Sequence, residues 1–502
     1  MGTDERLDPR AAPLELDPDE FRRLGHEAVD AVADFLRSLP ERPVAPGESA
    51  GEVRAALGGA GLPEAGAPAG ELLAEAARLL FAHSTFNGHP RFLAYITASA
   101  APIGALGDLL AAAVNPNVAG SPLAPLATEL EAQTIGWIAE LLGYRAGCGG
   151  LLVSGGNMAN FVGFLAARTA QARWDVRAGG ISAPGSLPLR VYVSAETHTW
   201  IEKATDLFGL GTDAIRWIET DSEQRLLVPA LRERIAADRA DGALPFLAVG
   251  TAGTVSTGAI DPLPEIADVC REEGLWFHVD GAYGAPAAAL PGAPAALAAL
   301  GRADSLAVDP HKWLYAPLEA GCALVRDPQA LRDTFSYRPP YYKLPEGEAA
   351  PIHYVDLGPQ NSRGFRALKV WLALRQAGRS GYVRMISDDI ELARELHRLA
   401  EADPELEAWT TSLSITTFRY VPAGVEPGTP AGEELLNRLN AELLDRLERG
   451  GEVFLSNAVV RGTYLLRACV VNFRTGRADI RAVPEIVKRV GAGIAREPGA
   501  TA

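Results

Sequence analysis

The chain has 502 residues, of which 48% are hydrophobic and 22% are charged, a composition typical of globular proteins. This length exceeds what one small core can bury, so two or three domains are expected. The 63 acidic residues outnumber the 47 basic ones, which gives a net charge of −16 and argues against a nucleic-acid or anionic-membrane surface.

Targeting and redox signals point to a cytoplasmic protein. No apolar run approaches the ~20 residues of a membrane helix, and the acidic N-terminus lacks the apolar core of a secretory signal. MGTDER also lacks the serine or threonine of a myristoylation motif. The four cysteines lie far apart without metal-ligand spacing, so we expect reduced thiols and no metal site.

Three helical segments are predicted near the N-terminus. Apolar residues recur at helical spacing over 21–37, after a possible N-cap at Asp17 or Asp19. Further helices are predicted over 49–57 and 71–82. These helices can bury little by themselves, so residues 1–97 are expected to pack against something larger, such as a second subunit.

From about residue 100 the pattern changes to helical segments that alternate with short apolar runs. This alternation is typical of an α/β domain with a largely parallel sheet, which we assign to residues 98–384. The predicted strands are 150–153, 190–193, 246–250, 275–279, 305–308 and 323–325. A Pro/Gly/Tyr-rich stretch, 337–359, is predicted to be a long loop of the functional kind, followed by a helix over 365–376.

The remaining residues, 385–502, are predicted to form a smaller α+β domain. Its predicted helices are 386–401 and 432–449, and its predicted strands are 413–420, 453–455 and 464–471.

Polar side chains follow the predicted strands, at the edge where open α/β sheets bind ligands. Gly155, Gly156 and Asn157 form a glycine-rich turn that opens a helix and suits a phosphate, although the glycines could serve only a tight turn. The turn is not GxGxxG, so a dinucleotide site lacks its fingerprint. His198 could lie flat on a planar cofactor or be structural. Thr251 could reach a cofactor substituent or cap a turn.

Two further strand ends carry an acid and a lysine. Asp280 follows an apolar run and could pair with a protonated pyridine nitrogen, or else cap a helix. Lys312 follows the next run, 32 residues on; a lysine withdrawn from water becomes a nucleophilic amine, although it could also extend to solvent. The acid, the amine, the phosphate turn and the flat imidazole together are the set that pyridoxal phosphate (PLP) needs.

On these residues the chain resembles the group II PLP-dependent amino-acid decarboxylases, which include aromatic-L-amino-acid and glutamate decarboxylases. The resemblance runs from FRRLGHEAVD near the N-terminus to about residue 475. Its most specific matches are HVDGAYG at 278–284 and DPHKW at 309–313. Other matches are ATELE at 127–131, ETH at 196–198 and GTAGTVSTGAIDP at 250–262.

The resemblance implies a fold-type-I enzyme of the aminotransferase-like kind, which works as a homodimer with active sites at the subunit interface. By position, Lys312 would form the aldimine with PLP, Asp280 would pair with the ring nitrogen, and His198 would stack on the ring. The cofactor-binding residues that it implies are Gly155, Gly156, Asn157, His198, Thr251, Asp280, Ala282, His311 and Lys312.

The long loop gains a role from the same resemblance. Such decarboxylases carry a loop tyrosine that protonates the quinonoid carbon, and counting back from GFRALK at 364–369 places Tyr354 there. Aldehyde-forming relatives often carry phenylalanine at this position, so Tyr354 favours simple decarboxylation. Packing of Tyr354 at the dimer seam is the alternative.

The substrate pocket is expected to be apolar, which favours an aromatic L-amino acid that is decarboxylated to its amine and CO2. The residues that we assign to it are Phe92, Tyr95, Ile96, Thr97 and Leu123. Two departures from aromatic decarboxylases leave the substrate open: Gly156 and Asn157 replace phosphate-site serines, and the segment at 88–99 opens like the glutamate-type HPRF. Arg91 could then serve an acidic substrate.

Several alternatives stay open. An acidic amino-acid decarboxylase and an aldehyde-forming oxidative decarboxylase share these motifs. Aminotransferases and cysteine desulfurases share the order of the acid and the lysine, but not the His-Lys-Trp context. A non-catalytic family member acting as a scaffold would not take up PLP.

Overall fold

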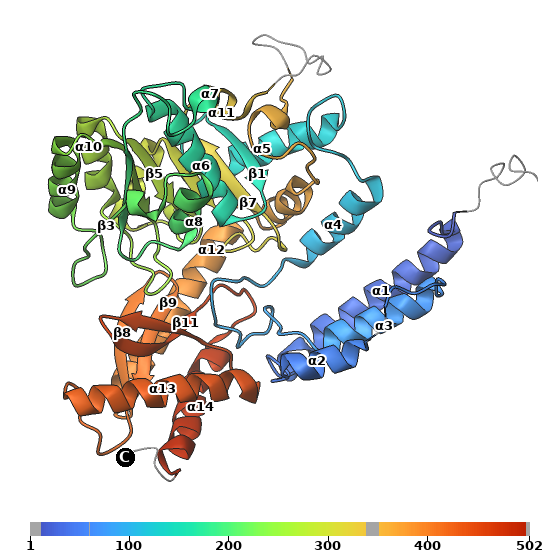
Figure 1. Ribbon diagram of the computed structural model, residues 1–502. Helices are drawn as coiled ribbons and strands as arrows, with labels where there is room; N and C mark the ends of the chain where they lie inside the picture. Colours follow the sequence, from blue (N-terminus) through green and yellow to red (C-terminus); the bar gives the residue numbers. More distant parts are fainter. Residues whose placement is uncertain (1–11, 60, 338–350, 498–502) are drawn as a thin grey trace, which may run out of the picture.

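The protein has an α/β body, a smaller α+β part below it and a projecting helical arm (Figure 1). The computed structural model describes residues 12–59, 61–337 and 351–497. Within these ranges, no helix combines the length and the apolar character needed to cross a membrane.

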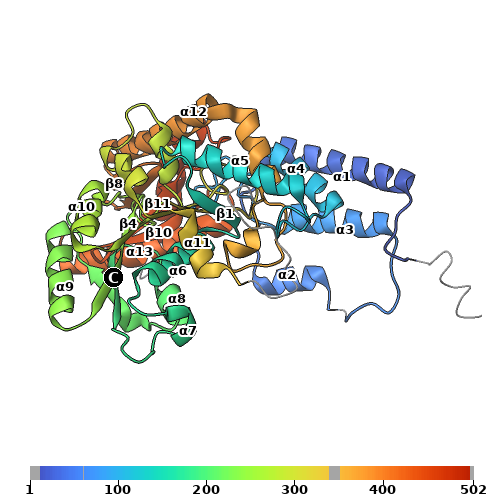
Figure 2. The ribbon, with the colours of Figure 1, turned by 90° about the horizontal axis from the view of Figure 1, so that it is seen from above.

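The helical arm contains the three predicted helices, which are confirmed: α1 (Pro18–Ser38), α2 (Ala50–Leu57) and α3 (Ala69–Ala82). The Asp17 side chain caps α1 by accepting hydrogen bonds from the first-turn N–H groups of Asp19 and Glu20. Helices α1 and α3 run side by side and extend beyond the body in both views (Figure 2). Leu24 is the only fully buried residue of these three helices, so the arm has almost no core of its own.

The large domain is built on a seven-stranded sheet of order β1-β7-β6-β5-β4-β2-β3. Strands β2 to β6 run parallel, whereas β7 is antiparallel to both of its neighbours. Their bounds are β1 (Gly149–Val153), β2 (Leu189–Ser194), β3 (Ile215–Ile218), β4 (Leu244–Thr251), β5 (Trp276–Asp280), β6 (Ser305–Val308) and β7 (Gly321–Val325). The six predicted strands are confirmed. Strand β3 was not predicted, because it has only four residues and Arg216 interrupts its apolar run.

Helices cover both faces of this sheet, as expected for parallel strands that are buried on both sides. They are α5 (Pro125–Leu141), α6 (Gly156–Gln171), α8 (Trp200–Leu207), α9 (Val228–Ala240), α10 (Leu263–Glu273) and α11 (Pro328–Phe335). Helix α4 (Pro102–Val114) packs instead on α12 (Ala367–Ala402), and the short α7 (Val176–Gly179) packs on α6. Short 3-10 turns are η2 (Leu39–Glu41), η3 (Thr212–Ala214), η4 (Ala285–Ala289), η5 (Ala295–Arg302) and η6 (Tyr354–Asp356).

One long helix, α12 (Ala367–Ala402), joins the large domain to the small one. It unites the two helices predicted over 365–376 and 386–401, with a kink at Gly378, whose φ is +63°. The proposed boundary near residue 385 falls within α12 and remains a prediction. Of the predicted long loop, 338–350 lies outside the described residues.

The small domain has an antiparallel sheet of order β10-β11-β9-β8 covered by two helices. The elements are β8 (Leu406–Ser412), β9 (Ile415–Tyr420), α13 (Pro430–Gly450), β10 (Ser456–Val460), β11 (Thr463–Cys469) and α14 (Arg477–Ala495). The strand predicted over 453–455 is wrong. Phe454 makes only an isolated bridge with Phe92, and the strand begins at Ser456.

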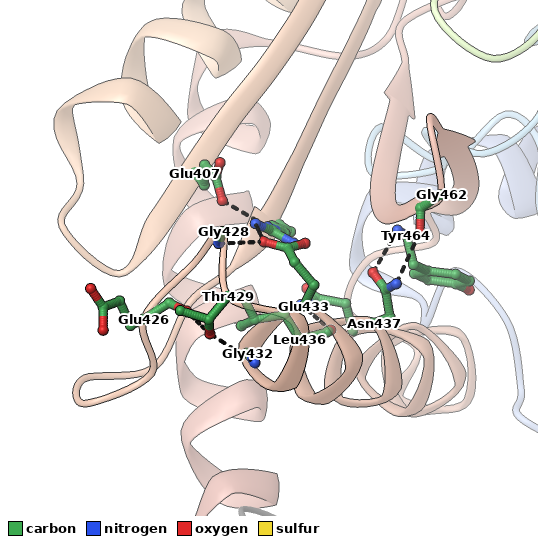
Figure 3. A network of polar contacts seen from close by, with 12 residues as sticks. Glu407, Glu426, Gly428, Thr429, Gly432, Glu433, Leu436, Asn437, Gly462 and Tyr464 are labelled. Carbon is green, nitrogen blue, oxygen red and sulfur yellow. Dashed lines mark hydrogen bonds and ion pairs between the residues drawn. The ribbon is translucent and has the colours of Figure 1, made fainter.

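Polar contacts tie the small-domain sheet to α13 (Figure 3). The buried Arg419 guanidinium pairs with Glu407 at 2.7 Å and with Glu433 at 2.6 Å. Asn437 on α13 donates to the carbonyl of Gly462 and accepts from the amide of Tyr464, so the helix also holds the β10–β11 turn.

Candidate active site

A cavity of about 330 Å³ lies at the carboxyl ends of β2, β4, β5 and β6 and at the N-terminus of α6. Parallel strands bring their ends to one edge, so residues distant in sequence meet there. All nine residues predicted to bind the cofactor line this cavity, from Gly155 to Lys312.

The glycine-rich turn presents the start of α6 to the cavity. No side chain caps this helix, so its first N–H groups remain available to an anion. Gly155 has φ +145°, and a Cβ on Gly156 would lie 2.6 Å from Oδ2 of Asp309. The turn therefore needs glycine at both positions, and the cradle suits a phosphate.

Lys312 lies in a tight turn after β6, and its amine reaches the cavity. The Nζ atom lies 3.0 Å from Oδ2 of Asp309, whose other oxygen has no hydrogen-bond partner among the described residues. No role was predicted for Asp309 of the DPHKW motif; an acid three residues before the lysine was the available signal. Asp309 holds the amine in the cavity.

Two imidazoles flank this amine. Burial lowers the pKa of His198 and of His311, so both rings are neutral at pH 7. His311 Nδ1 lies 2.7 Å from the carbonyl oxygen of Ala320, which fixes its orientation. A neutral, flat ring at position 198 can cover a planar cofactor without adding positive charge.

Asp280 ends β5 and is buried at the cavity wall. Its Oδ1 accepts from the Ala282 amide at 3.2 Å, and its Oδ2 accepts from Asn160 Nδ2, also at 3.2 Å. The first contact resembles a capping interaction. The second was not expected, since Asn160 lies 120 residues away in the chain.

Thr251 adds an unused donor. Its hydroxyl is buried at the cavity and has no hydrogen-bond partner in the described part of the chain. The amine suits the aldehyde of PLP, and the carboxylate suits its ring nitrogen. The helix N-terminus suits its phosphate. The flat imidazole suits the ring face, and the free hydroxyl suits the ring oxygen. The residues present therefore fit this cofactor.

Of the five predicted substrate residues, all within the described ranges, only Ile96 lines the cavity of its own chain. Phe92 is instead buried against Phe454 with ring centroids 5.5 Å apart. Tyr95 and Leu123 are 57% and 65% exposed and do not line the cavity of their own chain, and neither does Thr97. Arg91 and Tyr354 also lie outside its wall. Glu196 and Tyr283, for which no role was predicted, do line the cavity; they belong to the ETH and HVDGAYG motifs.

Tyr354 is 1% exposed and lies under the Arg363 guanidinium, 4.4 Å from its ring centroid. Arg363 in turn forms a buried ion pair with Glu131 of α5. Burial raises the pKa of the Tyr354 phenol well above its ordinary value.

The fold and the cavity define a PLP-dependent enzyme of fold type I. Residues 54–421 match the family model described as the pyridoxal-dependent decarboxylase conserved domain. The chain belongs to this family and is a PLP-dependent amino-acid decarboxylase.

Known relatives cover nearly the whole chain. An aromatic-L-amino-acid decarboxylase of Bacillus atrophaeus is 35% identical over 92% of this chain and 93% of its own. A phenylacetaldehyde synthase of a Rosa hybrid cultivar is 30% identical over 91% and 90%. The crystal structure of Oryza sativa TDC with PLP and tryptamine superposes with a TM-score of 0.88 and 28% identity, covering 96% of this chain and 99% of that one.

Proposed function

We propose that the protein decarboxylates an aromatic L-amino acid to its amine and CO2. The charge of the cavity carries this proposal. Lys312 is the one cationic side chain of the described cavity wall, whereas Glu196, Asp280 and Asp309 are acidic. A glutamate- or aspartate-type substrate brings a second carboxylate, for which the described wall offers no cation besides Lys312, and Lys312 is already paired with Asp309. The relative named for aromatic amino acids agrees with this choice, whereas the relative named for phenylacetaldehyde agrees with an aromatic substrate but is named for an aldehyde product.

When bound, PLP supplies a conjugated, electron-withdrawing ring that accepts the electrons of the broken Cα–carboxylate bond. Each side chain has a defined task toward it. Lys312 provides the amine that holds the cofactor aldehyde, and Asp280 keeps a proton on the ring nitrogen. His198 and Ala282 would enclose the two ring faces, while Thr251 would donate to the ring oxygen. The start of α6, at Gly155, Gly156 and Asn157, would bind the phosphate, with His311 beside it.

Tyr354 is proposed to protonate the carbon that loses CO2. Burial raises the pKa of the Tyr354 phenol and makes it a weaker acid where it lies, so proton donation requires that it leave this buried position. Since it lies buried against Arg363 rather than in its own chain's cavity, it would act after a loop movement or in the cavity of a second copy.

A homodimer is proposed for two reasons. The arm and the neighbouring α4 expose large apolar side chains: Phe21, Val29, Val32, Leu72, Leu73, Leu80, Leu106, Leu109, Leu110 and Val114. The predicted substrate residues Tyr95 and Leu123 are also exposed, and a second copy would let them complete the partner's cavity.

We further propose a cytoplasmic location. All four cysteines are free thiols, and three of them are buried, as expected in a reducing compartment. Fractionation of the source cells checks this; recovery with a secreted or membrane fraction would contradict it.

Product analysis tests the proposed reaction. PLP-loaded protein is incubated with pooled L-amino acids, and the products are identified by mass spectrometry. Tyramine, tryptamine or phenethylamine is expected; γ-aminobutyrate or β-alanine would contradict the aromatic pocket. Lys312→Ala is the control without turnover. Tyr354→Phe should divert product toward aldehyde with oxygen uptake, and an unchanged amine yield would remove its proposed role.

A further inference from the structure

A buried chain of hydrogen bonds extends from Asp280 into the core of the large domain. Trp276, His278 and Asp280 alternate along β5, so their side chains point to the same face of the sheet. Helix α6 contributes Asn160 on this face, and β6 contributes Ser305, which is paired in register with His278. All five side chains are buried.

Four contacts connect these residues, which we call the Trp276–Asp280 relay. Trp276 Nε1 lies 2.8 Å from Ser305 Oγ, and Ser305 Oγ lies 2.7 Å from His278 Nδ1. His278 Nε2 lies 2.8 Å from Asn160 Oδ1, and Asn160 Nδ2 lies 3.2 Å from Asp280 Oδ2. Each link is within hydrogen-bond distance.

The direction of the relay follows from its two ends. The indole N–H of Trp276 can only donate, and an ionised carboxylate at Asp280 can only accept. Because the Asn160 amide nitrogen donates to Asp280, its Oδ1 faces His278 and must accept a proton from Nε2. The neutral ring then has a bare Nδ1, which accepts the proton of Ser305, while Ser305 accepts from Trp276. The amide nitrogen of Asn160 faces Asp280, so every donor points toward the carboxylate.

The other protonation states of His278 break this pattern. A proton on Nδ1 alone would leave a bare Nε2 facing the Asn160 carbonyl oxygen, two acceptors at 2.8 Å. Protonation of both nitrogens is disfavoured because burial lowers the pKa of His278 to about 4. Trp200 packs edge-on against the ring, with centroids 5.7 Å apart.

The close approach of α6 makes the relay possible. A Cβ on Gly163 would lie 2.7 Å from the imidazole of His278. Gly163 and Asn160 are three residues apart on one helix face. Glycine at one position therefore brings the amide at the other within reach of both His278 and Asp280.

We propose that the relay directs a hydrogen bond onto Asp280 and orients its carboxylate toward the ring nitrogen of PLP, with Asn160 and His278 as positioning residues. Hydrogen bonds that end on a charged acceptor are stronger than neutral ones, and a chain of aligned donors strengthens each link. A buried carboxylate without such donors would tend to take up a proton and lose its hold on a pyridinium. The inference rests on the proposed pairing of Asp280 with that nitrogen.

The first test needs no cofactor. Nitrogen-15 NMR of the imidazoles in the apoenzyme reports the protonation of His278, and His278→Gln identifies its resonances. A neutral ring protonated at Nε2 is expected from pH 5.5 to pH 8. A proton on Nδ1, or an imidazolium in this range, would overturn the proposed direction of the relay.

The second test compares PLP with an analogue in which C–H replaces the ring nitrogen. Asn160→Leu removes the donor to Asp280 at similar volume. It should weaken PLP binding about tenfold and leave the analogue's dissociation constant unchanged, because only PLP carries the proton that Asp280 holds. The matched control is Asn440→Leu, which removes a buried amide of α13 in the small domain and should change neither constant.

The outcomes separate the relay from the pairing on which it rests. Wild-type protein that binds both compounds equally would overturn the Asp280 pairing and the relay with it. Wild-type preference for PLP that Asn160→Leu retains would overturn the relay alone. Ser305→Ala breaks the same relay at its far end and substitutes for Asn160→Leu if that variant does not fold.

Discussion

At the scale of single residues, the turn that carries Lys312 is fastened to α12 through one carboxylate. Trp313 Nε1 and the Tyr315 hydroxyl both donate to Oδ2 of Asp389, at 2.8 and 2.6 Å. Burial raises the pKa of Asp389 to about 7, so this group takes up a proton near neutral pH. The contact lies beneath the active-site lysine rather than at the cavity.

Asp389→Asn should change how the stability depends on pH. Because the folded-state pKa lies above the ordinary value of 3.8, the wild type loses stability as pH rises from about 4 to 7. Both donors use one oxygen, which an amide retains. The unfolding free energy of the variant should therefore rise relative to that of the wild type by up to about 1.4 kcal/mol per pH unit in this window. Urea unfolding at several pH values measures the difference. The exposed neighbour Asp388→Asn is the control; parallel curves for wild type and Asp389→Asn would contradict the assignment.

At the scale of elements, the small domain is held by charges that link its sheet to α13. Glu433 of α13 reaches Arg419 of β9 and also accepts from the Gly428 amide at 2.8 Å (Figure 3). The hydrogen bonds from Arg419 are the main reason that the pKa of Glu433 falls to about 2. Arg419 is itself buried, so removing one of its two acidic partners leaves the positive charge of its guanidinium poorly compensated.

Glu433→Gln should lower the unfolding free energy by about 1.5–3 kcal/mol at pH 7, the range for hydrogen bonds to charged groups. A depressed folded-state pKa gives stability above the unfolded value of 4.5 that is lost as pH falls toward 2. The unfolding free energy of the variant should therefore fall less than that of the wild type as pH falls through this range. Thermal denaturation between pH 2.5 and 7 measures it. The adjacent Glu434→Gln, at a more exposed position, should behave like the wild type; an equal loss there would point to a general charge effect.

At the scale of the whole molecule, the projecting arm is the feature that a single copy does not explain. Its helices bury almost nothing in their own chain, yet α1 and α3 carry exposed apolar side chains. Association through this arm would cover that surface and bring Tyr95, Leu123 and Tyr354 toward a partner's cavity.

Leu72→Glu combined with Leu80→Glu should separate the proposed dimer. The wild type should sediment at twice the 53.1 kDa chain mass, whereas the double variant should sediment as single chains with at least tenfold less activity. Val459→Glu, an exposed apolar residue of β10, is the control and should leave the mass unchanged. An active wild type at the mass of one chain would contradict both the dimer and the shared site.

The sequence alone determined the fold class, the cofactor and the group of residues around it. Buried parallel strands are continuous apolar runs, so their ends could be read directly, and parallel topology brings those ends together. Asp280 and Lys312 could be found in this way because each follows such a run. Edge strand β3 could not, because it has only four residues and Arg216 breaks its apolar pattern.

Only the tertiary structure decided which side chains meet across elements. Asn160 reaches Asp280 over 120 residues of chain, and this contact depends on how closely α6 packs on the sheet. The same holds for the burial of Tyr354 under Arg363 and for the exposure of Tyr95 and Leu123. Local patterns record the periodicity and chemistry of a segment. The direction and burial of a side chain are set by neighbours that the local pattern does not contain.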